Sequence, residues 1–319
     1  MYANAAAVSR PEISAFLEEA QSVENLLIGS RVLPVYTSEK RAGRYPRLRI
    51  QNGELLTSGG DKRGPSGTYN EVNREWEWDT FDCEDRGLEE RIDDTLREEM
   101  SDFFDMEVTT AKLVRRALML QHEIRAAAAV LDTGVFTATN SAVAYTEANI
   151  ATIDFARDIS DAISRMEALG QVPNTLIMSR SVFNRIRRSS KLQTYIYGNI
   201  PGAGNKDITP NTLSGAFDVP LNVLVAGANY NTAKKGQSYS LSAIWGNSYI
   251  SLANVQGGDF ANAGMGRTIV WGADVAGGQF QTETYRSEAR RSDVIRVRTH
   301  DSLKILDATA AQIITTQYS

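Results

Sequence analysis

The most constraining feature of the sequence is a proline-free stretch, residues 88–131, in which apolar residues recur at intervals of three and four. This spacing predicts one long α-helix with a single apolar face. It should end at Asp132-Thr133-Gly134, because Gly134 can adopt the left-handed conformation that closes helices. Unbroken, it would span about 65 Å, whereas a compact globule of 319 residues has a radius of gyration of roughly 20 Å. We therefore expect an extended, plate-like subunit. A kink in such a helix would lie at residues 108–110, which are all β-branched.

Composition excludes several classes of protein. The net charge of -5 does not suit a free-standing nucleic-acid binder, which is usually basic. The single cysteine, Cys83, excludes a disulfide framework and a thiolate metal cluster. Two histidines are too few for a typical zinc enzyme. The sequence has no run of about 18 apolar residues, the length that a membrane-spanning helix requires. From these observations together we expect no cofactor, no metal and no membrane partner.

The first eighty residues combine a helix with a long hairpin. Residues 11–29 predict a helix, preceded by a short tail that we expect to be ordered only on a partner. Residues 32–80 predict a two-stranded antiparallel loop, with strands at 47–50 and 76–80 and a glycine-rich tip at 59–67. Such a hairpin has too few apolar residues for a core of its own. It must lie on another surface, in this chain or in a neighbour.

Charge is sorted along this part of the chain. Residues 31–63 hold eight basic residues against three acidic ones, and residues 75–107 hold fifteen acidic residues against three basic ones. Either both are solvated faces, or the basic loop of one subunit lies over the acidic segment of the next. The predicted contact residues between subunits are Arg41, Arg44, Arg47, Arg49, Lys62 and Arg63 on the basic side, and Glu89, Glu90, Asp93, Asp94, Glu98 and Glu99 on the acidic side. Trp76 and Trp78 share one strand face and are predicted to anchor the loop on apolar surface.

The remaining chain predicts a small α/β module followed by long strands. Helices at 153–170, 181–191 and 209–217 alternate with strands at 176–178, 221–226, 241–245 and 249–252. Alternating residues then predict strands at 268–271, 279–288 and 293–300, and shorter apolar pieces follow at 303–306 and 313–314. The fold class is α+β.

Sequence motifs offer little for catalysis. The glycine loop 198–206 lacks the spacing and the final Ser/Thr of a phosphate-binding loop, and no Gly-x-Ser-x-Gly element is present. Paired acids at 93–94 and 98–99 read as an exposed stripe. His122 is expected to pack or hydrogen-bond within the helix, and His300 to lie on the polar face of its strand. The sequence therefore predicts no catalytic residues.

The order of these parts, with two local patterns, resembles the major capsid protein of tailed bacteriophages. The patterns are 118–123 leading into 126–131, and 284–288 continuing through 293–297 to Leu306-Asp307. The resemblance implies the Hong Kong 97-type (HK97-like) fold. Its parts would be an N-terminal arm and helix (1–31), an extended loop (32–84), a peripheral domain with a spine helix (85–152), an axial α/β domain (153–254) and the returning peripheral strands (255–319).

The resemblance also implies a function and partners. Hexamers and pentamers of the chain would form the icosahedral shell around a double-stranded DNA genome, in the virion after assembly in the host cytoplasm. A separate scaffolding protein is expected, because residues 1–10 leave little room for a fused scaffold. The other expected partners are a portal protein, a decoration protein and DNA bound without sequence preference. The alternatives are an encapsulin-like compartment subunit of the same fold and a soluble α/β enzyme.

Overall fold

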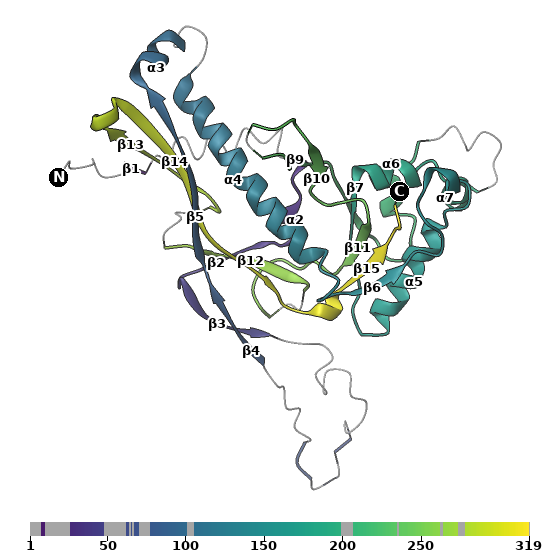
Figure 1. The fold of residues 1–319 in the computed structure, drawn as a ribbon. Helices are drawn as coiled ribbons and strands as arrows, with labels where there is room; N and C mark the ends of the chain where they lie inside the picture. The colour runs from purple at the N-terminus through teal and green to yellow at the C-terminus, as the bar shows by residue number, and fades with distance from the viewer. Residues whose placement is uncertain are drawn as a thin grey trace.

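The computed structural model describes residues 8–9, 26–47, 62–63, 65, 67–69, 77–100, 105–198, 207–234, 236–261, 264–273 and 278–318. Its architecture is a long plate joined to a compact α/β module (Figure 1). None of the described helices combines the length and the apolarity that a membrane crossing requires.

The plate is a six-stranded sheet centred on the longest strand, β14 (Ser292–Ile305). Strand β5 (Glu84–Asp93) pairs along one edge of β14, and the other edge is shared between β13 (Gln281–Ser287) and β12 (Gly266–Trp271). Strand β2 (Val35–Ser38) lies parallel to β12, and β1 (Val8–Ser9) pairs with β13. The predicted strands of the last section are confirmed. The N-terminal tail was predicted to be ordered only on a partner, but its two described residues, Val8 and Ser9, pair with β13 of the same chain.

The predicted long helix is only partly correct. Helix α4 (Met106–Val130) begins at Asp105, whose carboxylate accepts from the N–H groups of Glu107 and Val108, and α3 (Asp94–Met100) precedes it. Residues 88–93, predicted as helix, belong to β5, because ten residues of this strand pair with β14. Gly134 has no left-handed conformation. Helix α3 ends at Met100 and α4 begins after Asp105, so the break lies before residues 108–110, where the kink was predicted.

The α/β module has a sheet ordered β6-β15-β11-β7-β8. Helix α5 shields a core that includes Phe155, Ile159 and Leu252. The predicted helix at 181–191 is two helices, with Ser189 between them in an extended backbone conformation and its hydroxyl donating to the Ile153 carbonyl. The bounds are β6 (Thr137–Asn140), β7 (Thr175–Ser179), β8 (Asn222–Ala226), β11 (Tyr249–Ala253), β15 (Ala311–Thr315), α5 (Phe155–Glu167), α6 (Arg180–Ile186), α7 (Ser190–Tyr197) and α8 (Pro210–Ser214).

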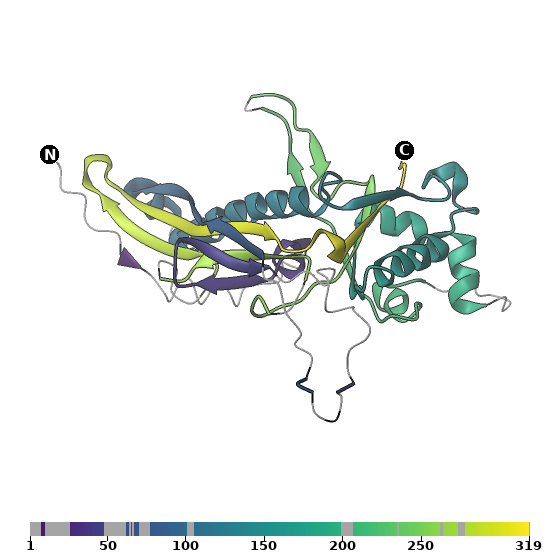
Figure 2. The ribbon, with the colours of Figure 1, turned by 90° about the horizontal axis from the view of Figure 1, so that it is seen from below.

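Two hairpins extend from this body. Strands β3 (Ala42–Arg47) and β4 (Glu77–Asp82) form the base of the predicted extended loop. Strands β9 (Asn229–Asn231) and β10 (Leu241–Ala243) form a smaller hairpin. Figure 2 shows β9–β10 rising on the side of the plate where α4 lies, with β3 on the opposite side. The short helices are α2 (Gly29–Val32), η2 (Glu147–Asn149), η4 (Glu288–Arg290) and η5 (Ala308–Ala310).

Several predictions concern residues that lie partly or wholly outside the part of the chain that the structure describes. The helix predicted at 11–29 lies mostly outside this part, and at its end Gly29 begins α2 instead of closing a helix. The tip of the extended loop and most of the glycine loop 198–206 also lie outside. The five-part division stays a prediction, although β6 and β15, from the segments 85–152 and 255–319, pair within the sheet of the α/β module.

Candidate assembly surfaces

The β3–β4 hairpin has one face on the body and one face turned outward. Tyr45 lies opposite Asp79 in the ladder, and Pro46 lies opposite Trp78. Because side chains alternate across a strand, Tyr45 shares the body face with its partner, whereas Pro46, Trp78 and Arg44 lie on the outward face. The exposed fraction of Tyr45 is 1%, and that of Trp78 is 64%.

An aromatic cluster holds the base of the hairpin. The ring of Tyr45 stacks on Phe260, with 5.2 Å between centroids, and Phe260 meets Tyr36 edge-on at 4.6 Å. Phe81 contributes a fourth ring, 6.4 Å from Tyr45. Tyr36 lies on β2 and Phe260 on the connection between β11 and β12, so the hairpin base is packed against two separate parts of the plate.

Polar contacts reinforce this anchor. The Arg47 Nε–H donates to the Leu306 carbonyl at 2.8 Å, and its Nη1 lies 3.4 Å from the Asp79 carboxylate. The Tyr45 hydroxyl donates to the same carboxylate at 3.0 Å. The backbone N–H of Thr80 is the main reason that the pKa of Asp79 lies below its ordinary value. Arg47, predicted to contact another subunit, is thus engaged within its own chain.

The other predicted basic residues remain at the surface. Arg41 is exposed and its Nε lies 3.8 Å from Asp82. Arg44 and Lys62 are exposed. Arg63 donates to the Gly67 carbonyl at 2.5 Å and lies over the Tyr69 ring. Arg49 lies outside the described residues.

Trp78 does not anchor the hairpin on the body of its own chain, and its predicted contact with another subunit stays a prediction. Its side chain lies on the outward face, because the alternation that buries Phe81 turns Trp78 away from the body. Trp76 lies outside the described residues. Tyr45 and Phe81 do the anchoring instead. The sequence signal that could have found them is an aromatic residue on the same face of each strand.

The predicted acidic residues divide into two groups. Glu89 accepts from the Tyr285 hydroxyl at 3.0 Å and from Arg296 Nη2 at 3.2 Å. The Tyr285 hydrogen bond is the largest cause of its lowered pKa. Asp93 accepts from the Thr95 N–H at 3.0 Å and is exposed, as is Glu90.

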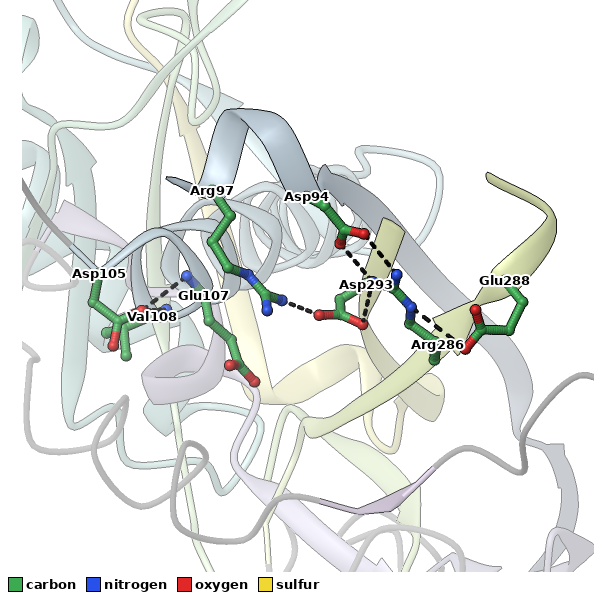
Figure 3. A network of polar contacts seen from close by, with 8 residues as sticks. All are labelled: Asp94, Arg97, Asp105, Glu107, Val108, Arg286, Glu288 and Asp293. Atoms are coloured by element: carbon green, nitrogen blue, oxygen red, sulfur yellow. Dashed lines mark hydrogen bonds and ion pairs between the residues drawn. The ribbon is translucent and has the colours of Figure 1, made fainter. Parts of the chain in front are cut away.

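The far end of the plate carries a network of ion pairs (Figure 3). Arg286 binds both carboxylate oxygens of Asp94, at 2.6 and 2.7 Å, and also reaches Asp293 at 3.3 Å. Arg97 contacts the same Asp293. The hydrogen bond from Arg286 lowers the pKa of Asp94. This network fixes α3 to the β13–β14 hairpin, while Glu98 and Glu99 on α3 stay exposed.

A surface hollow of about 280 Å³ lies over β5 and β14. Gly87 contributes to its floor, since a Cβ atom there would lie 3.2 Å from both the Val297 carbonyl and the Arg298 Cβ. The sequence did not reveal this hollow, because it depends on the register of two strands about 200 residues apart. Its lining residues are Asp85, Gly87, Leu88, Glu89, Arg296 and Arg298.

A buried carboxylate joins three segments near the end of α4. Glu123, 2% exposed, accepts from the N–H groups of Ile28 and Gly29, at 2.8 and 2.7 Å. It also accepts from Trp245 Nε1 at 2.6 Å. A Cβ atom on Gly29 would lie 2.7 Å from the carboxylate, so this approach requires glycine. The segment that leads to the extended loop is therefore fixed to α4.

A second buried carboxylate pairs with two arginines. Asp301, on β14, lies 2.6 Å from Arg125 of α4 and 3.2 Å from Arg86 of β5. Burial raises the pKa of Asp301, and the two guanidinium groups oppose that shift. This cluster ties helix and sheet together at the middle of the plate.

Both histidines are buried between elements. Burial lowers the pKa of His122 to about 4, and its Nε2 lies 3.4 Å from the Thr268 hydroxyl. His300 is buried on its strand face, because the Trp271 ring covers it edge-on at 5.3 Å. In the described part of the chain, no three His, Cys, Asp or Glu residues are grouped as a metal site. Burial raises the pKa of the Cys83 thiol to about 11.

Comparison with known proteins identifies the fold. No known sequence family and no curated protein matches the chain in sequence. In structure it is similar to a phage-related protein of Bordetella bronchiseptica, with a TM-score of 0.73, 19% identity and 98% of both chains covered. It is also similar to a putative prophage capsid protein of E. coli CFT073 (0.52, 12% identity, 98% and 99% covered) and to the SrpI encapsulin of Synechococcus elongatus (0.53, 9%, 99% and 92%). The predicted α+β, Hong Kong 97-type capsid fold is confirmed.

Proposed function

We propose that this chain is a major capsid protein, which assembles with copies of itself into the icosahedral shell around the double-stranded DNA of a tailed phage. The observation that carries the proposal is the fold, shared over 98% of both chains with a phage-related protein. The anchored β3–β4 hairpin supports it, because its outward face carries an exposed tryptophan.

The mechanism we propose is geometric. Each subunit is a plate held by buried ion pairs, and its hairpin reaches beyond its own core. A contact between two different surfaces of identical subunits generates rings when the rotation closes, which suits hexamers and pentamers. Many weak contacts in a closed shell act together, because each further contact is intramolecular. No catalytic residue is part of this proposal.

The partners belong to the proposal as well. They are a scaffolding protein during assembly in the host cytoplasm, a portal protein at one vertex of the virion, a decoration protein, and packaged DNA. The net charge of -5 suits an inner wall that binds DNA weakly and without sequence preference.

The test is electron microscopy of the purified full-length chain. We expect closed shells of uniform diameter. The matched control replaces residues 48–76 by a short Gly-Ser linker, which keeps the β3–β4 base and its aromatic cluster. This variant should stay folded by circular dichroism and form no shells. A wild-type chain that remains monomeric at milligram-per-millilitre concentration would refute the proposal.

An encapsulin-like compartment is the second candidate, supported by the similarity to the SrpI encapsulin. The two functions differ in what the shell contains and in its vertices. Particles isolated from the native host would show a portal vertex and DNA for a phage capsid. Particles without a portal that enclose a cargo protein would support the compartment.

A further inference from the structure

We infer that the buried carboxylate of Glu123 is a latch that couples the β9–β10 hairpin to the segment leading into the extended loop. The same carboxylate accepts hydrogen bonds from both, so displacing one of them loosens the other. The inference goes beyond the proposed function, because it concerns a connection inside one chain. It joins the two sides of the plate, since β9–β10 rises on the side where α4 lies and β3 lies on the opposite side (Figure 2).

The hairpin reaches the latch through Trp245, which lies two residues after the end of β10. This side chain is 2% exposed, and its Nε1–H donates to Glu123 Oε1 at 2.6 Å. Just before it, the N–H of Ile244 donates to the Ala228 carbonyl at 3.1 Å and closes the root of the hairpin. Beyond the root, Tyr239 is 72% exposed. The hairpin is therefore an exposed arm with one buried end.

The loop segment reaches the latch through its backbone. Glu123 Oε1 also accepts from the N–H of Ile28 at 2.8 Å, and Oε2 accepts from the N–H of Gly29 at 2.7 Å. These two donors lie at the start of α2, which is followed by β2 and then by β3 at the base of the extended loop. Oε1 is therefore shared between the hairpin and the loop segment.

The surroundings of Glu123 leave its carboxylate little freedom. Glu123 is 2% exposed, so water cannot replace a donor that moves away. A Cβ atom on Gly29 would lie 2.7 Å from Oε2 and 3.1 Å from the Ala126 Cβ, so the loop segment already lies at its closest approach to α4. When one donor leaves, the charged group is stabilised by turning toward solvent, and it then loses the other donors as well.

The coupling is reciprocal, as any energetic coupling between two sites must be. A contact that displaces the hairpin loosens residues 28–33, and a contact that pulls on these residues loosens the hairpin. Given the proposed function, the hairpin and the extended loop would meet their neighbours on opposite sides of the shell wall. A binding event on one side would then change how firmly the loop is held on the other.

Hydrogen exchange of the full-length chain, followed by mass spectrometry, tests the coupling from the loop end. Gly29→Ala places a methyl group against the carboxylate and leaves the hairpin sequence unchanged. We expect the backbone N–H groups of residues 228–246 to exchange at least about tenfold faster than in the wild-type chain. The matched control is Gly215→Ala, because a Cβ atom there meets nothing within 4 Å. It should leave exchange in residues 228–246 unchanged.

The second variant tests the coupling from the hairpin end. Trp245→Phe keeps an aromatic ring but removes the N–H that donates to Glu123. Exchange in residues 28–33 should become at least about tenfold faster. The control is Phe136→Leu, since Phe136 is 1% exposed in the same apolar cluster and gives up a ring but no donor. Its effect on residues 28–33 should be much smaller.

The outcome that overturns the inference is an effect confined to the substituted end. This would be faster exchange only in residues 28–33 for Gly29→Ala, or only in residues 228–246 for Trp245→Phe. Equal effects of Trp245→Phe and Phe136→Leu on residues 28–33 would also overturn it, because packing alone would then connect the two parts. Should Gly29→Ala fail to fold by circular dichroism, the pair Trp245→Phe and Phe136→Leu decides. A wild-type chain that forms no shells would overturn the proposed function and leave this result standing.

Discussion

The two halves of the molecule are stabilised in different ways. The α/β module has one continuous apolar core, which joins α5 to the sheet through residues such as Phe155, Ile159 and Leu252. Along the outer part of the plate, the apolar clusters between α4 and the sheet are small, and one consists of Ile92, Ala111 and Ile295. There the connections between elements are ion pairs, including those of Asp301 and Arg286. Only the C-terminal end of α4, through residues such as Ala126 and Val130, shares a larger apolar cluster with the module.

Because of this difference, the two halves should respond differently to pH and ionic strength. Apolar burial is non-directional, and simple salts such as NaCl do not screen it as they screen charges, so the module should behave as a rigid block. Ion pairs depend on pH, and partly exposed ones also depend on ionic strength. A plate held by them can respond to solution conditions while the module stays intact. Each prediction below is measured by urea unfolding of the monomeric variant with the shortened 48–76 loop.

The largest effect is expected in the module. Phe155→Ala removes a fully buried ring whose centroid lies 6.3 Å from that of Phe217. The cavity should cost about 4 kcal/mol of unfolding free energy, with the same loss at low and high salt. Val172→Ala, at a position 58% exposed, is the control and should change little. A small loss for Phe155→Ala would mean that the module is not the rigid block.

An intermediate effect is expected at the centre of the plate. Asp301→Asn removes the anion between Arg125 and Arg86, whose carboxylate has no exposed surface. Two cations then remain facing each other, and the loss should be about 3 kcal/mol. The control is Asp161→Asn, whose ion pair with Arg157 is exposed and should contribute little. Equal effects of the two variants would contradict the role assigned to the buried pair.

The smallest effect is expected at the far end of the plate, and it should depend on pH. Arg286 lowers the pKa of Asp94 in the folded chain, and the unfolded value is about 3.9. The pair therefore stabilises the fold above about pH 4, and this contribution is lost as pH falls through the lower folded pKa. Arg286→Met should destabilise most at pH 6 to 7 and least below about pH 3. Arg157→Met serves as the control, and a difference that stays constant with pH would refute this assignment.

Local patterns in the sequence specified much of the fold. Helix spacing identified most of α4 and α5, and alternation identified β12, β13 and β14, because these signals arise within one element. The expected hairpin is present at β3–β4, and its second strand lies where it was predicted. Its first strand ends at Arg47, where the predicted strand 47–50 begins, and residues 48–50 lie outside the described residues. Among the candidate assembly residues, the exposure of Arg44, Lys62 and Arg63 follows from their charge.

Contacts between distant segments decided the rest. The apolar residues Leu88 and Ile92 fit a helical stripe, yet pairing with β14 makes them part of a strand in which only Ile92 is buried. The same pairing gives Glu89 its partner Arg296, and it creates the hollow over Gly87. A backbone that can satisfy its hydrogen bonds as helix or as strand takes the form that its neighbours complete. The sequence by itself determined the periodicity of each segment. Only the tertiary structure determined the register between segments, because register depends on pairs of residues about 200 positions apart.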